Sequence, residues 1–162
     1  MKSLTSIIAI SIAVAAPLVA KAQVPVTAAA DQLAMLNSSD PVLAANKKLV
    51  FDMWREFLEA GHLETAEKYF TEDYIQHNPM VPSGRAALVE AFSAFAKRQP
   101  VKPEISGRLV AITAERDLVT LAFVREEPDP QDPSKRYTTT WFDMFRVEDG
   151  KIAEHWDTAT KP

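Results

Sequence analysis

The stretch that decides the fold is FDMFRVEDGKIAEHWD, residues 142–157, close to the end of the chain. Apolar and polar side chains alternate on both sides of Asp149-Gly150, and Asp-Gly is a dipeptide typical of tight hairpin turns. The residues just before this stretch are rich in Thr and aromatic side chains, which favour strands. The sequence therefore predicts a long strand over 137–147 and a final strand over 151–158.

The pattern upstream of this hairpin is helical at first and then changes to strand near Pro103. Apolar residues recur at helical spacing in the stretches 40–61, 63–70 and 83–99. Alternating stretches follow at 105–113 and 118–125, and a polar loop with prolines covers 127–135. Helices followed by hairpin-linked strands are typical of an α+β domain. We predict three N-terminal helices packed on one curved antiparallel sheet of about four strands.

Length and composition favour one globular domain. The chain has 162 residues, of which 47% are hydrophobic, and its net charge is −4. These values argue against intrinsic disorder. Cysteine is absent, which excludes disulfides, thiolate metal sites and cysteine nucleophiles. The acidic balance, without any basic run, argues against a nucleic-acid-binding surface.

The first residues have the three-part pattern of a secretory signal peptide. Lys2 supplies the positive start, residues 4–20 are apolar or small, and Ala20 and Ala22 provide the small residues before a cleavage site. A membrane anchor is the alternative, but the apolar stretch is marginal for a span of about 20 residues. We expect cleavage after Ala22, export to the periplasm or the exterior, and no membrane attachment afterwards. The predicted divisions are a signal peptide at 1–22, a lead segment at 23–39 and the domain at 40–162.

Three ionisable residues on the last two predicted strands are candidates for chemistry. Because side chains alternate along a strand, Asp143 points the same way as Trp141 and Phe145. If helices cover that face, the carboxyl group loses solvation and can transfer protons near neutral pH. His155 and Asp157 can point into the same space from the neighbouring strand. An imidazole there can carry a proton or stabilise an enolate oxygen.

A second group of candidates lies in the segment 74–79, Tyr-Ile-Gln-His-Asn-Pro. We interpret it as a loop between the second and third helices, since its proline restricts the backbone. Such a loop can place Tyr74, His77 and Asn78 at the mouth of a helix-covered cavity.

Each of these features also fits a purely structural interpretation. Asp143 can pair with a basic side chain on the sheet, and His155 with Asp157 can form a hydrogen-bonded pair. The segment 77–79 can be a simple turn, since Asn before Pro favours turn initiation. A metal held by His77, His155 and Asp157 is the weaker hypothesis, because the three ligands follow no known spacing motif.

The stretches 74–79 and 142–157 together resemble the SnoaL-like polyketide cyclase family of the nuclear transport factor 2-like superfamily. The resemblance covers roughly residues 42–158 and is strongest to the branch described as predicted aldol-condensation-catalysing proteins. It implies a cone-shaped α+β barrel, also called cystatin-like, in which a bent sheet wraps around helices and leaves a deep pocket. It also implies a homodimer that forms through the sheet.

The resemblance further implies a lyase or isomerase that acts on a carbonyl compound by acid–base chemistry, without metal or organic cofactor. Asp143 would move a proton α to the carbonyl, His155 and His77 would donate hydrogen bonds to the enolate oxygen, and Asp157 would orient His155. The expected ligand is a small hydrophobic or carbonyl-containing molecule. The predicted substrate-binding residues are Tyr74, Asn78, Trp54, Trp141 and Phe145.

Two other functions stay open at this point. An exported domain of the same fold could bind a small molecule without converting it, because fold alone does not decide between binding and catalysis. The chain could also be a structural dimer module whose pocket is filled by side chains. A cavity between Trp54, Asp143 and His155 would argue against the structural module.

Overall fold

A computed structural model of the chain describes residues 23–161, so the expected signal peptide lies outside the described residues. The helical elements are η1 (Ala34–Leu36), α1 (Pro41–Met53), the π-helical η2 (Trp54–Glu59), η3 (Leu63–Thr65), α2 (Ala66–Tyr69) and α3 (Arg85–Ser93). The strands are β1 (Phe70–Gln76), β2 (Leu109–Glu115), β3 (Leu118–Pro128), β4 (Arg136–Glu148) and β5 (Lys151–Asp157). Within this part of the chain, none of the helices has the length and hydrophobicity that crossing a membrane requires.

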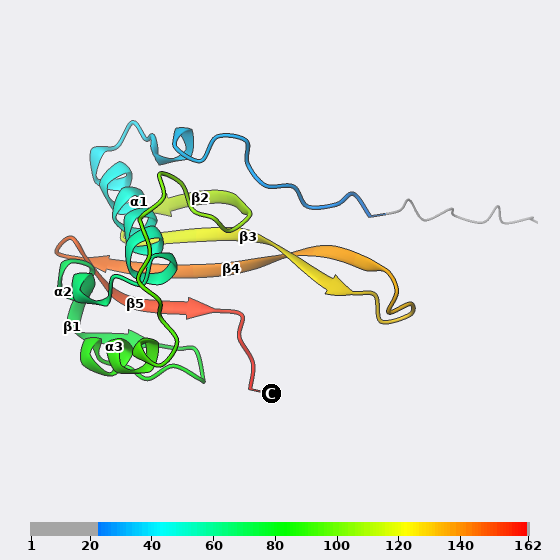
Figure 1. The fold of residues 1–162 in the computed structure, drawn as a ribbon. Helices are drawn as coiled ribbons and strands as arrows, with labels where there is room; N and C mark the ends of the chain where they lie inside the picture. Colours follow the sequence, from blue (N-terminus) through cyan, green and yellow to red (C-terminus); the bar gives the residue numbers. More distant parts are fainter. Residues whose placement is uncertain (1–22, 162) are drawn as a thin grey trace, which may run out of the picture.

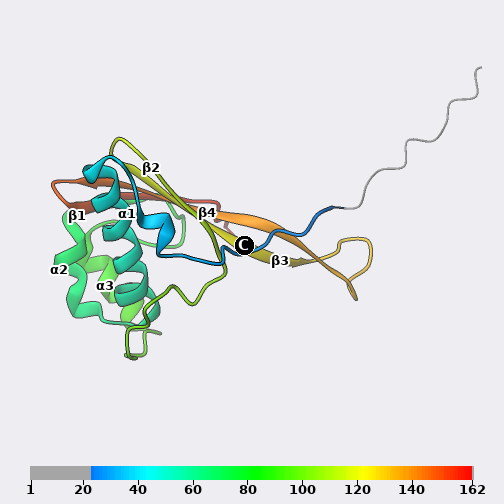
Figure 2. The ribbon, with the colours of Figure 1, turned by 90° about the horizontal axis from the view of Figure 1, so that it is seen from above.

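The strands form one sheet in the order β1-β5-β4-β3-β2, and the helices gather on one of its faces (Figures 1 and 2). The α+β class is therefore confirmed, and the cone-shaped barrel stays a prediction. Strands β2 to β5 pair antiparallel, as predicted, whereas β1 pairs with β5 in parallel. The sheet thus has five strands, one more than expected, and is mixed rather than purely antiparallel.

The additional strand β1 includes residues 74–76 of the segment 74–79 that we predicted as a loop. Its inward residues Phe70 and Tyr74 are buried, and polar residues separate them. A spacing of four fits a helix as well as a strand, and the pairing with β5 is irregular between Phe70 and Ile75. These two properties hid the alternation that marks a strand.

The hairpin between β4 and β5 forms as predicted. Asp149 and Gly150 both have positive φ angles, of 49° and 73°, as the tight turn requires. The pairing then shifts, because Val147 faces Ile152 whereas Arg146 faces Glu154. This bulge places Ile152 in the core, although strict alternation would put it on the face opposite His155.

The helix α1 begins as the sequence predicts and ends in a wider turn. Asp40 caps it by accepting the backbone N–H groups of Val42 and Leu43. After Met53 the helix continues as the π-helix η2, and π-helical turns are frequent at functional sites. The chain turns away at Gly61, whose φ is +66° and where a Cβ atom would lie 2.8 Å from a backbone oxygen of Lys97.

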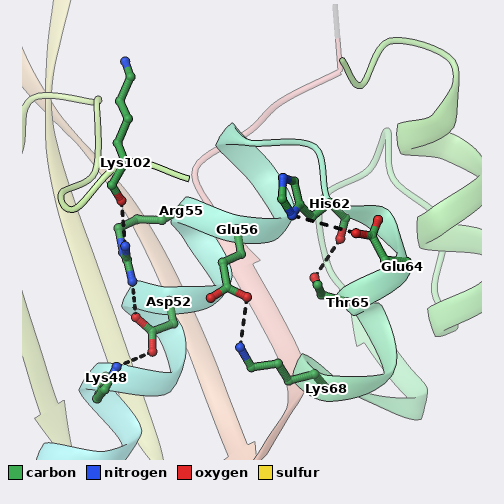
Figure 3. A network of polar contacts seen from close by, with 9 residues as sticks. All are labelled: Lys48, Asp52, Arg55, Glu56, His62, Glu64, Thr65, Lys68 and Lys102. Carbon is green, nitrogen blue, oxygen red and sulfur yellow. Dashed lines mark hydrogen bonds and ion pairs between the residues drawn. The ribbon is translucent and has the colours of Figure 1, made fainter. Parts of the chain in front are cut away.

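A network of polar contacts holds this helical unit in place (Figure 3). Arg55 donates to the carbonyl oxygen of Lys102 at 2.6 Å and pairs with Asp52, which also pairs with Lys48. Burial disfavours the charged form of Asp52, but hydrogen bonds from Lys48 and Arg55 outweigh this and lower the pKa of Asp52. Glu56 pairs with Lys68 of α2 at 2.9 Å. These contacts tie the helical unit that carries Met53 and Trp54 to α2 and to the segment that precedes β2.

The lead segment 23–39 packs along the domain and is joined to it by hydrogen bonds. The N–H of Val26 donates to the hydroxyl of Thr138 at 2.7 Å. Gln32 is buried, and its side-chain amide both donates to and accepts from the backbone of Ile105 at 2.9 Å. Buried Lys47 of α1 donates to the carbonyl oxygen of Met35 at 2.7 Å. The lead segment is therefore docked on the domain that follows it.

We predict that Gln32→Leu lowers the free energy of unfolding by roughly 2–4 kcal/mol, because it leaves the buried N–H and C=O of Ile105 without partners. Urea unfolding followed by circular dichroism measures this loss. The matched control is Gln23→Leu in the same segment, since Gln23 is exposed and its change should stay within about 0.5 kcal/mol. Equal effects of the two variants would contradict the docking of the segment through Gln32.

Candidate functional site

A cavity of about 160 Å³ lies between the helical layer and the sheet. Its apolar wall includes Met53, Trp54, Leu58, Leu88, Phe92 and Phe145. Its polar wall consists of Tyr74, Gln76, Asn78, Asp143, His155 and Asp157. Among the described residues that line the cavity, none is Lys or Arg. Because Trp54, Asp143 and His155 border open space, the structural module with a filled pocket is not supported.

The carboxyl group of Asp143 and the imidazole of His155 form a buried pair on β4 and β5. Their exposed fractions are 5% and 7%. Nε2 of His155 lies 3.1 Å from Oδ1 of Asp143, and the ring of Phe145 stacks on the imidazole with 4.5 Å between centroids. The other carboxyl oxygen of Asp143, Oδ2, is buried and has no hydrogen-bond partner within residues 23–161. A carboxyl oxygen without a hydrogen-bond partner retains its capacity to accept a proton.

Gln76 at the end of β1 holds the other side of the imidazole. Its Oε1 lies 2.8 Å from Nδ1 of His155 and accepts the backbone N–H of Asn78 at 2.9 Å. Its Nε2 donates to the hydroxyl oxygen of Tyr74 at 3.1 Å. The sequence did not lead us to Gln76, because we interpreted this segment as a loop. Strand alternation from buried Tyr74 would have placed Gln76 on the same inward face.

Asp157 lies at the cavity but contacts different partners from those expected. Its Oδ2 accepts the side-chain N–H of Asn78 at 2.6 Å, and its Oδ1 accepts the backbone N–H of Ala159 at 2.9 Å. No hydrogen bond joins Asp157 to His155 in the described part of the chain. The contact with His155 that we expected of Asp157 is made instead by Gln76.

The hydroxyl group of Tyr74 faces the polar wall of the cavity from β1. The side chain is 2% exposed. Burial raises the pKa of the Tyr74 hydroxyl above its ordinary value, and the nearby carboxylates of Asp157 and Asp143 raise it further. The hydroxyl is consequently protonated at neutral pH. Because its oxygen already accepts from Gln76, its O–H is available to donate to a ligand.

Two predicted site residues lie away from the cavity. His77 follows inward-facing Gln76 and points to the outer face of the sheet, where it stacks on Trp156 with 5.1 Å between ring centroids and contacts Glu154 at 2.7 Å. Hydrogen bonds from His77 and Arg146 lower the pKa of Glu154. Trp141 lies farther along β4, under the guanidinium of Arg125 at 4.6 Å. The expectations that His77 donates into the pocket and that Trp141 lines it are therefore corrected.

The residues that could hold a metal ion are Asp143, His155 and Asp157, whose ligand atoms lie within 4.8 Å of one another. The hydrogen bonds described above already occupy several of these atoms. His155 Nε2 contacts Asp143, and Asp157 accepts donors on both oxygens. Both ring nitrogens of His155 are occupied, by Gln76 and by Asp143, so a metal ion would have to displace one of these contacts before the imidazole could bind it. The donor set therefore fits a hydrogen-bonded cluster better than a metal centre.

We predict that dialysis against EDTA leaves the melting temperature of the protein unchanged within about 1 °C, because these hydrogen bonds need no metal. A metal at a hundred times its Kd would add about 2.7 kcal/mol of stability, which shifts the melting temperature by several degrees. Differential scanning calorimetry before and after dialysis makes the comparison. A metal centre would instead appear as a clear fall in the melting temperature after dialysis. Zn²⁺ would reverse this fall in the wild type, and the fall would not occur in Asp157→Asn.

Comparison with known proteins confirms the resemblance to SnoaL-like proteins. The family model described as a SnoaL-like domain matches residues 51–155. No curated protein matches the chain significantly. A protein from Acidithiobacillus ferrooxidans, provisionally described as a polyketide cyclase, has a TM-score of 0.52 and 18% identity over 75% of this chain and 89% of that one. A provisionally described SnoaL-like polyketide cyclase from Jannaschia sp. CCS1 has a TM-score of 0.49 and 17% identity, over 75% and 91%. At 18% identity, the likeness to the protein from Acidithiobacillus ferrooxidans shows the fold alone.

Proposed function

The chain belongs to the family of SnoaL-like domains, and on that premise we propose that it is a cofactor-independent enzyme that moves a proton on a small carbonyl compound. The observation that carries this proposal is the buried carboxyl group of Asp143. One of its oxygens contacts His155, and the other has no partner within residues 23–161. A carboxyl group held in this way at an apolar cavity is suited to acid–base chemistry.

The first step we propose is the removal of a proton from the carbon next to the carbonyl group. Oδ2 of Asp143 takes that proton, and the electron pair of the C–H bond moves into the enolate. His155 balances the charge of Asp143 through its contact with Oδ1. The apolar side chains around the pair exclude water, which strengthens these electrostatic interactions.

The enolate oxygen needs a hydrogen-bond donor, and we propose that Tyr74 supplies it. The Tyr74 hydroxyl is buried and protonated, and its O–H is available. A single preorganised donor of this kind is worth about 3–4 kcal/mol of barrier lowering. The proposal thus assigns to Tyr74 the role that we first expected of His77.

The completed reaction is of the aldol-condensation type or an isomerisation. In the aldol type, the enolate carbon attacks a second carbonyl of the same molecule, a C–C bond forms, and the new alkoxide takes the proton from Asp143. In an isomerisation, Asp143 returns the proton to a different carbon. Neither sequence consumes an oxidant, a reductant or a cofactor.

The cavity also limits the substrate that we propose. Its wall carries the carboxyl groups of Asp143 and Asp157 and no Lys or Arg among the described lining residues, so an anionic group would be repelled and left without a partner. Its volume of about 160 Å³ is below the roughly 300–1,000 Å³ of pockets for drug-sized ligands. We therefore propose an uncharged, acyclic or single-ring carbonyl compound as the substrate.

We predict that Asp143→Asn lowers the rate of α-proton removal by roughly 10²–10⁴-fold, because the amide cannot accept the proton. The assay is the exchange of α-protons for deuterium in D₂O, followed by ¹H NMR on a panel of uncharged ketones and β-diketones. The control is Asp149→Asn in the β4–β5 turn, where Asn tolerates the positive φ. An unchanged rate in Asp143→Asn would refute the role of Asp143.

One observation favours a second function, that of an exported domain that binds a small molecule without converting it. The contact of Asp143 with His155 also fits an ion pair whose role is purely structural. The same assay distinguishes the two functions. A compound that binds, protects the fold and shows no accelerated exchange would support the binding domain.

We also propose that two copies of the chain associate through the outer face of the sheet. Within residues 23–161, the helices lie on the other face of the sheet (Figure 2). Phe142, Met144 and Trp156 line a shallow apolar hollow on the outer face together with Thr120, and Phe142 is 47% exposed. Neighbouring apolar side chains on a bare sheet face are typical of an interface between proteins.

We predict that Phe142→Glu converts a dimer into a monomer, because it places a charge in the centre of this apolar hollow. Light scattering coupled to size-exclusion chromatography measures the mass. Phe95→Glu is the control, since Phe95 is 66% exposed but lies beyond α3 on the helical layer. The mass of this variant should equal that of the wild type. A monomeric wild type, or a Phe142→Glu variant that remains dimeric, would overturn the proposed interface.

A further inference from the structure

We infer that Gln76 is a positioning residue that fixes Nδ1 of His155 as a hydrogen-bond donor, so that the contact between His155 and Asp143 contains a proton of its own. The pair then holds one proton more than a neutral imidazole beside a carboxylate, and it bears no net charge. Only the kinetic consequence rests on the proposed function. The protonation state follows from the hydrogen-bond network alone.

The orientation of the Gln76 amide is decided by its other partners. The backbone N–H of Asn78 points at one end of the amide at 2.9 Å, and a backbone N–H can only donate. That end is therefore the carbonyl oxygen, Oε1. The opposite end, Nε2, donates to the hydroxyl oxygen of Tyr74 at 3.1 Å. The Asn78 contact decides the orientation, because a flipped amide would turn its NH₂ group toward a backbone N–H, whereas the Tyr74 hydroxyl could pair with either end of the amide.

The tautomer of His155 follows from this orientation. Its Nδ1 lies 2.8 Å from the same carbonyl oxygen, and an oxygen without a hydrogen can only accept. Nδ1 must therefore carry a hydrogen. In a neutral imidazole with Nδ1–H, the other nitrogen, Nε2, has a lone pair and no hydrogen.

Nε2 nevertheless lies 3.1 Å from Oδ1 of Asp143. A lone pair and a carboxylate oxygen repel each other at this distance, so a hydrogen must lie between them. The pair is either an imidazolium with a carboxylate or an imidazole with a carboxylic acid. Both forms hold the same number of protons and carry no net charge, which lowers the cost of burying them.

Among the groups around the pair, Gln76 is the one that determines the protonation state. The other titratable side chains on the polar wall are Tyr74 of β1 and Asp157 of β5, while the helices contribute apolar side chains such as Trp54. The ring of Phe145 stacks on the imidazole and offers no polar atom. Without the amide, His155 could place its one hydrogen on Nε2 and donate to an ionised Asp143, which would leave the pair negative.

The experiment is ¹⁵N NMR of the histidine side chains in the wild type and in Gln76→Leu. The chain has three histidines, so His62→Gln and His77→Gln assign the signals of His155. In the wild type we expect Nδ1 of His155 to be protonated, and in Gln76→Leu we expect the hydrogen on Nε2 alone. Gln76→Glu, whose carboxylate can accept both N–H groups, should keep Nδ1 protonated. A wild-type Nδ1 without a hydrogen would overturn the inference, and this result needs no variant to fold.

The deuterium-exchange assay separates this inference from the proposed function. If Asp143 acts as proposed, Gln76→Leu should lower kcat at least tenfold with a smaller change in KM, and Gln76→Glu should recover part of the loss. A switched tautomer with an unchanged kcat would refute the positioning role. If no compound exchanges in the wild type while Nδ1 is protonated, the proposed function fails and the assignment of the tautomer stands.

Discussion

The contact between Asp143 and His155 is the interaction on which the site depends. Two ionisable groups that are 5% and 7% exposed are stable inside a domain only when they compensate each other. The fold achieves this by pairing β4 with β5, so that Phe145 lies opposite His155 and Asp143 opposite Asp157. The hairpin turn and the bulge that follows it are therefore part of the site, because they set the register that brings the imidazole to the carboxyl group.

Much of this arrangement could be predicted from the hairpin sequence. Alternation on β4 and β5 correctly placed Asp143 and His155 on the inward face. The Asp-Gly turn correctly indicated that these two strands form a hairpin. The register shift between Arg146 and Val147 was not visible in the sequence, since a bulge adds one residue without changing composition. Ile152 therefore reached the core from a position that strict alternation assigns to the other face.

The part of the site on β1 could not be predicted in the same way. Phe70 and Tyr74 are four positions apart, a spacing that helices and strands share. Strand β1 also gains its stability from parallel pairing with β5, a contact that no local pattern encodes. Mistaking this strand for a loop hid Gln76 and left His77 as a pocket residue. The same alternation that brings Gln76 to the imidazole turns His77 toward Glu154 and Trp156.

The most direct measurement is a crystal structure of the mature protein with 2,4-pentanedione, a small uncharged compound with an acidic α-carbon. We predict that the compound lies in the cavity between Trp54 and the polar wall, with one carbonyl oxygen beside the Tyr74 hydroxyl and the α-carbon beside Oδ2 of Asp143. Both Asp143 and His155 should remain buried. Either side chain turned outward into water, or the compound bound only elsewhere, would contradict it.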